Sequence, residues 1–373
     1  MSDIMMKILV FGMTEMQGGI ESFLMNYYKN IDRARFHFDF LCNTYNKIAY
    51  EDEILSLGGK TFHFTARRDN PIRFYRELKS FFKIHAKEYD AIWVNVCSLA
   101  NIDYLIMAKK YGIQKRIIHC HNSQNMDSKL RGLLHSFNKR RIDRIATDYW
   151  SCSPDASSWF YPEELMNQVV VINNAIDVNR FCYDEEARNR LRKNYDLSDK
   201  TVIGNVGRLH FQKNQEFALK VYADFQKKIP ESVLLLIGDG EDKEKLKKQA
   251  VELNIDKKVL FLGVQNNVPE WLSAFDVFLF PSVFEGLSLA ALEAQANGLP
   301  VLASDGVIPT DIKMNSNFHF YSLEKSAECW SNELQMIIKK EHRESRENIQ
   351  KVFVEKGFEI YSAVKTVEQL LEK

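Results

Sequence analysis

Short apolar runs alternate with helix-like stretches along the 373-residue chain, and this alternation is the strongest constraint on its fold. Between the runs, apolar residues recur at helical spacing, as at Ile20, Phe23, Leu24, Tyr27 and Tyr28. Strands that alternate with helices predict a parallel sheet with helices on both faces. The first series of predicted strands is Lys7–Phe11, Phe38–Cys42, Ala91–Val96, Arg116–Cys120, Thr147–Ser151 and Val169–Ile172.

The same pattern starts again after a polar segment between Asp184 and Lys200, which is the best candidate for a domain boundary. The second series of predicted strands is Val202–Val206, Val233–Ile237, Val259–Leu262, Val277–Phe280 and Pro300–Ala303. Two doubly wound α/β domains in tandem are therefore expected. Ligands of such sheets bind beyond the carboxyl ends of the strands, so the expected site is a cleft between the domains.

Composition narrows the class of protein. A hydrophobic content of 45% and a charged content of 27% fit a well-packed soluble protein. Fifty basic and fifty acidic residues balance, so the net charge does not call for nucleic acid. The six cysteines form no C-x-x-C pair, which favours a reducing compartment. With no secretory signal and no run of about 18 apolar residues, the expected location is cytoplasmic.

The first chemical motif runs from Gly204 to Asn214. A predicted strand ends in a turn at Gly207, Arg208 and Lys213 follow, and a helix is expected near Asn214. The free N–H groups of a helix start favour anions, Arg suits bidentate phosphate contact, and Lys adds a point charge. This segment predicts a diphosphate site; two solvated cations beside a turn are the alternative.

The second motif runs from Phe280 to Ala294. Pro281 ends a very apolar strand, and Ser288 is a plausible N-cap for the helix that follows. Glu293 stands among apolar neighbours more than one turn into that helix, so its carboxylate needs partners. Two vicinal ribose hydroxyls would satisfy both oxygens, while Glu285 would face a sugar or its phosphates. A helix-start Glu and a buried structural Glu are the alternative.

With these motifs the chain resembles the retaining glycosyltransferases of family 4, which have the GT-B fold. The resemblance is carried by Gly207-Arg208, Lys213-Asn214, Gly238-Asp239-Gly240, Pro281-Ser282, Glu285-Gly286, Glu293-Ala294, Gly298 and Pro300-Val301. It implies two Rossmann-like domains with a cleft between them. They are an acceptor-binding domain at 1–182 and a nucleotide-sugar-binding domain at 183–350, followed by a terminal helix at 351–373 that packs back on the first domain.

The resemblance also assigns roles to residues. Arg208 and Lys213 would hold the diphosphate, Glu293 the ribose and Glu285 the donor sugar. Gly18-Gly19 would bring backbone amides to donor or acceptor, and His121 would contact the donor sugar. The expected catalytic residues are His121, Glu285, Arg208 and Lys213. The expected donor-binding residues are Gly18, Gly19, Gly207, Arg208, Lys213, Gly238, Val264, Glu285, Gly286, Leu287, Ser288, Leu289 and Glu293.

The expected reaction moves a hexose or N-acetylhexosamine from a nucleotide diphosphate sugar, with UDP as the expected nucleotide. The acceptor would be a glycan or a lipid-linked saccharide, because Asn315–Phe320 resembles the members that build bacterial capsule and exopolysaccharide. A same-face substitution would retain the anomeric configuration, with the leaving phosphate taking the acceptor proton. No cofactor and no metal are expected, since no D-x-D triplet occurs and His119 and His121 lack further ligands at metal-binding spacing.

Three other functions fit parts of the pattern. A GT-B sugar-nucleotide 2-epimerase shares the architecture, but the segment from Glu285 to Glu293 argues against it. A dinucleotide-dependent oxidoreductase would carry G-x-G-x-x-G after the first strand. This sequence lacks the motif, because Gly12 stands alone there. A non-catalytic sugar-nucleotide binder would carry the same candidate residues. A hydrolysis screen over sugar nucleotides discriminates these classes.

Residues 129–144 interleave basic and apolar side chains. Such a helix could lie on an anionic membrane, which would place the enzyme peripherally at the inner face of the cell membrane. The alternative is a solvated helix whose leucines pack on the core. The sequence leaves both open.

Overall fold

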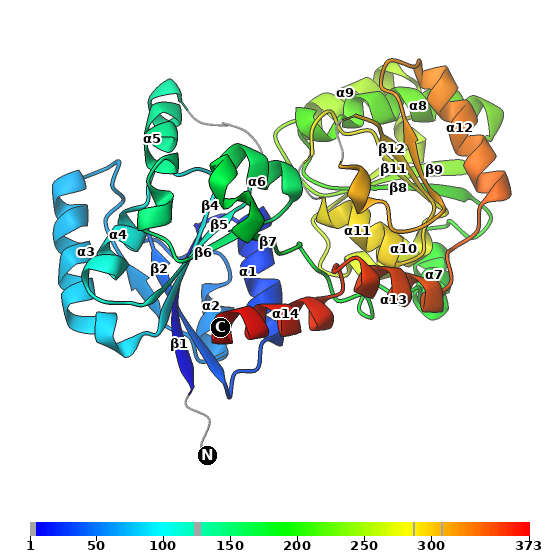
Figure 1. Ribbon diagram of the computed structural model, residues 1–373. Helices are drawn as coiled ribbons and strands as arrows, with labels where there is room; N and C mark the ends of the chain where they lie inside the picture. Colours follow the sequence, from blue (N-terminus) through cyan, green and yellow to red (C-terminus); the bar gives the residue numbers. More distant parts are fainter. Residues whose placement is uncertain (1–4, 123–127, 286–287, 307–308) are drawn as a thin grey trace. The chain divides into compact units, whose positions relative to one another are not determined.

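The computed structural model describes residues 5–122, 128–285, 288–306 and 309–373, and the chain forms two compact units. Unit 1 comprises Met1–Ala175 and Ile360–Lys373, and unit 2 comprises Ile176–Glu359 (Figure 1). These limits differ from the expected divisions at 182 and 350. Ile176, Val178 and Phe181 pack in the core of unit 2 together with Phe353 and Phe358. The chain therefore passes from unit 1 to unit 2 after Ala175 and returns after Glu359.

The described residues of unit 1 form a seven-stranded parallel sheet in the order β3-β2-β1-β4-β5-β6-β7. Its strands are β1 (Met6–Phe11), β2 (Phe36–Cys42), β3 (Thr61–His63), β4 (Ala91–Val96), β5 (Lys115–Cys120), β6 (Asp148–Ser151) and β7 (Val169–Val171). All six strands predicted for this half are present. Sequence reasoning missed β3, a three-residue edge strand whose side chains are only half-buried.

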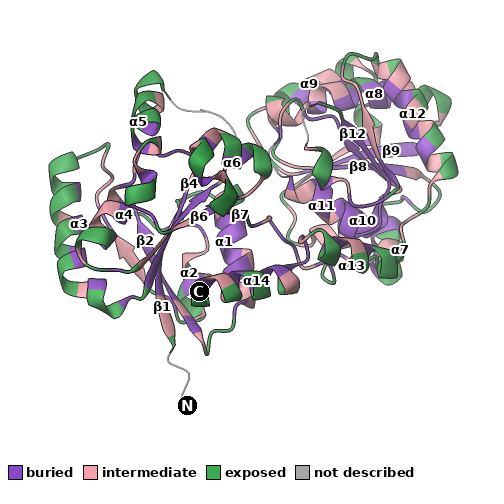
Figure 2. Ribbon diagram, viewed as in Figure 1, coloured by how far each residue is buried: buried purple, intermediate pink, exposed green. Residues whose placement is uncertain are grey.

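Helices cover both faces of this sheet (Figures 1 and 2). They are α1 (Gly19–Asn30), α2 (Glu51–Ser56), α3 (Pro71–His85), α4 (Asp103–Lys110), α5 (Lys129–Lys139), α6 (Pro154–Phe160) and α14 (Ile360–Glu372). Along β4, Ile92 and Val94 belong to one core cluster, whereas Ala91 and Trp93 belong to the other. Alternate side chains of a strand point to opposite faces, so the sheet separates two cores. α3, α4 and α6 fill the first core, and α1, α2 and α14 fill the second.

The described residues of unit 2 form a six-stranded parallel sheet in the order β10-β9-β8-β11-β12-β13. Its strands are β8 (Thr201–Val206), β9 (Ser232–Ile237), β10 (Val259–Gly263), β11 (Val277–Phe280), β12 (Val301–Ser304) and β13 (Phe318–Tyr321). The five strands predicted here are present, and β13 at the edge is additional. Both sheets are parallel and buried on both faces, which explains their near-continuous apolar runs.

The helices of unit 2 also lie on both faces of its sheet (Figure 2). They are α7 (Glu185–Asn194), α8 (Gln215–Lys228), α9 (Lys243–Glu252), α10 (Val268–Ala274), α11 (Leu289–Ala296), α12 (Ala327–Lys340) and α13 (Arg346–Glu355). Short 3-10 helices connect elements in both units: η1 (Ala86–Glu88), η2 (Ile142–Arg144), η3 (Glu163–Gln168), η4 (Phe211–Lys213), η5 (Asp256–Lys258) and η6 (Thr310–Ile312). Within the described ranges, no helix has both the length and the apolar character needed to cross a membrane.

Candidate functional site

The loop after β8 lies where the strand order of unit 2 reverses. β8 is paired with β9 on one side and β11 on the other, so the loops after β8 and β11 leave the same sheet edge side by side. Gly207 opens the first loop, and its N–H donates to the carbonyl of Ile237 at 2.9 Å. A Cβ on Gly238, whose φ is +132°, would lie 2.0 Å from the Gly207 carbonyl oxygen. Only glycine fits there, so the loops after β8 and β9 approach closely.

An ion pair joins the loops after β8 and β11. The Lys213 Nζ lies 2.7 Å from Glu285 Oε1, although the two residues are 72 positions apart. Both side chains are largely buried, and the Lys213 ammonium lies 5.2 Å from the centroid of the Phe280 ring. The predicted phosphate cation and the predicted sugar-facing carboxylate therefore meet in the structure.

Three further hydrogen bonds hold the same two loops together. The Gln212 side-chain amide donates to the Phe284 carbonyl at 2.9 Å, and the Val283 N–H donates to the Gln212 carbonyl at 2.9 Å. The Asn214 side-chain amide donates to the Pro281 carbonyl at 2.9 Å. The backbone that carries Glu285 is thus tied to the segment that carries Lys213.

Arg208 does not join this ion pair. Its guanidinium contacts the Glu241 carboxylate at 3.1 Å, and His210 Nε2 lies 3.3 Å from the other oxygen of that carboxylate. The Arg208 side chain is exposed. A solvated ion pair of this kind contributes little to stability, so the guanidinium can exchange partners readily.

Glu293 lies on α11 in the predicted apolar surroundings. Burial raises the pKa of its carboxyl to about 7, and the positive charge of Arg180 opposes this shift. Within the described residues, no hydrogen bond or ion pair to this carboxylate occurs. Arg180 was not predicted from the sequence. Glu293 keeps hydrogen-bonding capacity that a ligand can use.

The other predicted residues of unit 2 that the structure describes follow β10 or stand at the start of α11. Val264 follows β10 and is exposed, next to Gly263 at a φ of +68°. Ser288 occupies the N-cap of α11, as predicted, but its side chain makes no capping hydrogen bond. Leu289 is the first residue of that helix. Gly286 and Leu287 lie outside the described residues.

His121 follows β5 in unit 1 and is held by a residue that the sequence analysis missed. Its Nε2 lies 2.9 Å from Asn95 Oδ1, and the Asn95 amide nitrogen donates to the Phe11 carbonyl at 3.2 Å. The oxygen of Asn95 therefore faces the ring, so Nε2 carries the imidazole proton. Burial lowers the pKa of His121 to about 3, which keeps the ring neutral. An Asn inside the apolar run Ala91–Val96 was the signal available in the sequence.

Gly12, the lone glycine after the first strand, stands where no side chain would fit. A Cβ there, at a φ of +146°, would lie 2.7 Å from the Cβ of Asn95. Gly12 therefore allows Asn95 to approach and orient His121.

Gly18 and Gly19 mark the start of α1 at the same sheet edge of unit 1. Gly18 is the N-cap, and a Cβ on Gly19 would meet no atom within 4 Å. The preceding loop is fixed by Glu21, whose Oε1 accepts hydrogen bonds from the Thr14 N–H at 3.2 Å and the Thr14 hydroxyl at 2.6 Å. The predicted glycine turn is thus a helix start with open space beside Gly19.

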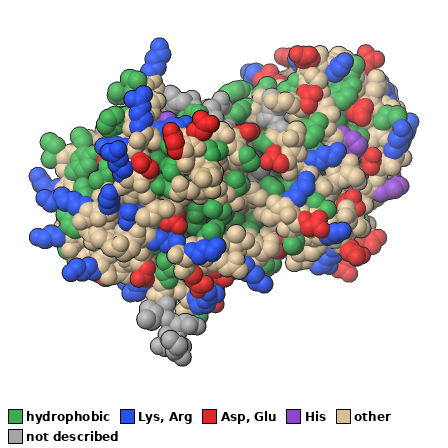
Figure 3. All heavy atoms as spheres, viewed as in Figure 1, with side chains coloured by type: hydrophobic (Ala, Val, Ile, Leu, Met, Phe, Trp, Pro, Cys, Tyr) green, Lys and Arg blue, Asp and Glu red, His purple; other side chains and the backbone are tan. Residues whose placement is uncertain are grey.

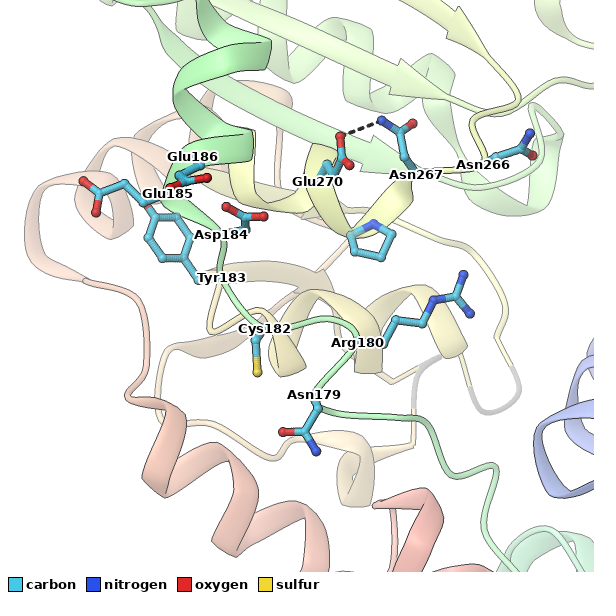
Figure 4. Close-up of a pocket in the computed structure, with 11 residues that line it drawn as sticks. Asn179, Arg180, Cys182, Tyr183, Asp184, Glu185, Glu186, Asn266, Asn267 and Glu270 are labelled. Carbon is cyan, nitrogen blue, oxygen red and sulfur yellow. Dashed lines mark hydrogen bonds between the residues drawn. The ribbon is translucent and has the colours of Figure 1, made fainter. Parts of the chain in front are cut away.

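A cavity of about 600 Å³ lies in unit 2 (Figure 4). Its lining comes from residues 179–186 and from the start of α10, with Arg180 lying across from Asn266 and Asn267. None of the predicted site residues lines this cavity, but Arg180 connects it electrostatically to Glu293. Across the described ranges, no group of three or more His, Cys, Asp or Glu side chains suits a metal ion.

The sequence pattern of the family described as glycosyl transferases group 1 matches residues 186–352. A Bacillus subtilis (strain 168) protein named "Putative glycosyltransferase EpsF" is 31% identical over 300 residues, covering 78% of this chain and 77% of that protein. This chain belongs to the group 1 glycosyl transferases. It is therefore a glycosyltransferase that acts on sugar-nucleotide donors.

Two further comparisons bear on this glycosyltransferase. An Escherichia coli protein named UDP-Gal:alpha-D-GlcNAc-diphosphoundecaprenol alpha-1,3-galactosyltransferase is 37% identical over 142 residues, which are 37% of each chain. The crystal structure of Anabaena Alr3699/HepE in complex with UDP matches with a TM-score of 0.81 and 18% identity, covering 98% of this chain and 100% of that one. The architecture of the group 1 glycosyltransferase is GT-B, with two Rossmann-like units.

Proposed function

We propose that the enzyme is a retaining glycosyltransferase of family 4 that transfers a hexose or N-acetylhexosamine from a UDP-sugar. The acceptor is a glycan or a lipid-linked saccharide, and the product serves capsule or exopolysaccharide synthesis. The observation that carries the donor assignment is the Lys213–Glu285 ion pair, because it places a cation and a carboxylate at the switch point of the unit 2 sheet.

In this proposal Lys213 and Arg208 bind the donor diphosphate. The Arg208 guanidinium exchanges the carboxylate of Glu241 for a phosphate, to which it can donate two parallel hydrogen bonds. Negative charge grows on the diphosphate as the bond to the anomeric carbon breaks. Two cations near that charge stabilise the transition state more than the ground state.

The two glutamates have different roles. The Glu293 carboxyl, which makes no hydrogen bond within the described residues, accepts hydrogen bonds from the ribose hydroxyls. Glu285 orients Lys213 and contacts the donor sugar. It is not assigned as a nucleophile, because its carboxylate is engaged by the Lys213 ammonium. A same-face substitution, with the leaving phosphate accepting the acceptor proton, retains configuration without a protein nucleophile.

The neutral His121 ring and the Gly18-Gly19 helix start supply contacts from unit 1. With Nε2 donating to Asn95, the unprotonated Nδ1 is available as a hydrogen-bond acceptor for a sugar hydroxyl. The helix start at Gly19 supplies N–H donors for an anionic group. No cofactor and no metal are part of the mechanism.

The names of three relatives support the substrate class. The Escherichia coli relative is named for UDP-Gal and a diphosphoundecaprenol acceptor. A Campylobacter jejuni relative, 32% identical over 135 residues, is likewise named for a diphospho-undecaprenol acceptor. A Salmonella typhi relative, 34% identical over 104 residues, is named for Vi polysaccharide biosynthesis. Cytoplasmic location with peripheral contact at the inner face of the cell membrane, through residues 129–144, is part of the proposal.

Hydrolysis of a panel of sugar nucleotides tests the donor assignment. We expect slow release of UDP from one UDP-sugar and a released sugar that keeps the anomeric configuration of the donor, as followed by proton NMR. Release of the inverted sugar would disprove retention. Isomerisation of the sugar without UDP release would instead favour the 2-epimerase.

A further inference from the structure

The apolar stripe of α5 faces away from both cores of unit 1. Leu130, Leu133, Leu134 and Phe137 follow helical spacing and therefore share one face of the helix. Leu130, Leu133 and Phe137 are 68%, 69% and 59% exposed. The sequence left open whether these leucines pack on the core, and the structure shows that they do not.

Polar residues attach α5 to the rest of unit 1 instead. His135 and Asn138 are the buried residues of this helix. The Asn138 amide donates to the Leu99 carbonyl at 2.6 Å, and His135 Nδ1 accepts from the Leu99 N–H at 3.1 Å. The His135 ring also stacks on Trp159, with centroids 4.3 Å apart. Neither core cluster of unit 1 includes an α5 side chain. An ordinary surface helix buries its apolar face, whereas α5 buries polar side chains and exposes its apolar face.

Basic side chains surround the stripe. Residues 129–144 contain six Lys or Arg and one acidic residue, Asp143. Lys129, Arg131 and Arg140 are exposed, and the Arg141 guanidinium lies 4.8 Å from the centroid of the Phe137 ring. Figure 3 shows hydrophobic and basic side chains next to each other over this helix.

We propose that α5 docks on the surface of an anionic phospholipid bilayer, with Leu130, Leu133 and Phe137 inserted at the boundary between headgroups and acyl chains. Exposed apolar side chains flanked by cations are what such a surface recognises. The excess of positive charge argues against a second copy of the same face, because two such faces would repel each other. The inference deepens the proposed function and rests on it for one point, that a lipid-linked acceptor gives this docking a use.

Co-sedimentation of the full chain with vesicles tests the proposal. One set of vesicles contains phosphatidylcholine alone, and the other contains phosphatidylglycerol and phosphatidylcholine in equal parts. We expect binding to the anionic set that is at least about a hundredfold stronger than to the neutral set and that weakens as salt is added. Equal partitioning to both sets, or none to either, would overturn the proposal.

Replacement of the stripe separates docking from unspecific adhesion. Leu130→Ser with Leu133→Ser and Phe137→Ser should weaken binding to anionic vesicles by about tenfold or more, since each side chain loses its apolar burial. The matched control replaces three exposed apolar residues of unit 2, Val251→Ser, Met336→Ser and Val354→Ser, and should change binding by less than about twofold. Equal losses in both variants would count against α5.

Replacement of the cations tests the electrostatic part. Lys129→Gln with Arg131→Gln and Arg140→Gln should weaken binding by about a hundredfold, because each cation near an anionic surface contributes about fivefold. Its control carries three exposed lysines changed in unit 2: Lys227→Gln, Lys248→Gln and Lys257→Gln. The Lys129/Arg131/Arg140 variant keeps the apolar stripe, so it still tests the proposal if the serine variant fails to fold.

Sugar-nucleotide hydrolysis without vesicles provides the independent readout. All four variants should hydrolyse the donor at the wild-type rate, which shows that they are folded. An enzyme that binds anionic vesicles but cleaves no sugar nucleotide would disprove the proposed function and leave the docking surface standing. An active enzyme that ignores vesicles, but whose concentration-dependent dimer is lost in the serine variant, would replace the bilayer with a second copy of the chain.

Discussion

At the scale of single residues, the unit 2 site depends on charges that meet far from each other in sequence. Lys213 and Glu285 neutralise each other in largely buried positions, whereas Arg208 stays at the surface with Glu241. Sequence motifs placed all three chemically interesting side chains at strand ends. They did not pair Lys213 with Glu285 or Arg208 with Glu241, because those contacts connect separate strand–helix junctions.

The double variant Arg208→Ala with Lys213→Ala tests the diphosphate assignment. We expect kcat for UDP-sugar turnover to fall by about a hundredfold to a thousandfold, since both cations act on charge that develops in the transition state. Steady-state kinetics measure this, with Lys248→Ala and Lys257→Ala as an exposed-lysine control. Turnover within a few-fold of wild type would show that the diphosphate binds elsewhere.

Lys213→Ala alone should also destabilise unit 2. The variant leaves the buried Glu285 carboxylate without its cation, at an expected loss of about 1–3 kcal/mol in the free energy of unfolding. Adding Glu285→Gln should recover part of that loss, because no unpaired charge remains. Urea denaturation measures the free energy of unfolding of the single variant and of the double variant. Equal values for the two would show that the unpaired Glu285 charge does not affect stability.

Glu293 should make stability depend on pH. Its folded pKa is about 7, against an ordinary value of 4.5, so the folded state binds more protons between these values. The contribution of this carboxyl to the free energy of unfolding is fully present below about pH 4.5 and is lost as the pH rises through 7. The contribution lost in this way is about 3 kcal/mol. Glu293→Gln should therefore be more stable than wild type at pH 8, with the gain shrinking towards pH 5. Urea unfolding across this pH range measures the difference, and parallel curves would show that the pKa of Glu293 is not raised.

At the scale of elements, the loops of unit 2 are shaped by glycines that leave no room for a side chain. A Cβ on Gly240 would lie 2.2 Å from the Leu209 carbonyl oxygen, and one on Gly204 would overlap the Phe275 ring. The sequence indicated a turn after β9, where Gly240 stands, whereas Gly204 lies inside β8. Which glycine is required follows from the neighbour that approaches it, and that neighbour is the Leu209 backbone of the loop after β8 for Gly240 and the Phe275 ring before β11 for Gly204.

Gly240→Ala and Gly263→Ala form a matched pair for this point. Gly240→Ala should lower the free energy of unfolding by about 1–3 kcal/mol, because the added methyl clashes with backbone that cannot yield. Gly263→Ala meets no atom within 4 Å and should lose only about 1 kcal/mol, from its positive φ. Thermal melts compare the two, and a larger loss at Gly263 would contradict the close approach at Gly240.

At the scale of the whole molecule, the last helix belongs to the first unit. α14 buries Ile360, Val364, Val367 and Leu371 in the core that also contains Phe23 of α1. Glu368 accepts a hydrogen bond from the Asp32 N–H at 2.8 Å. The amphipathic pattern predicted a terminal helix, and the family resemblance implied its return to the first domain.

Val367→Asp should destabilise unit 1 selectively. Val367 is fully buried, and an unpaired carboxylate there should cost about 3 kcal/mol or more. Calorimetry should show the transition of unit 1 moving to lower temperature while that of unit 2 stays. Val354→Asp, at an exposed position of α13, is the control and should move neither transition by more than a degree or two.

The sequence by itself determined the two series of parallel strands, the helices that alternate with them, and the polar residues at the carboxyl ends of strands. These features depend on local periodicity and turn chemistry. Tertiary structure alone decided that Asn95 orients His121, that Arg180 acts on Glu293, and that the leucines of α5 face outward. Periodicity identifies an apolar face of a helix but not what covers it. That depends on which partners the folded chain brings near, and for α5 the partners in unit 1 are the polar backbone of Leu99 and the ring of Trp159.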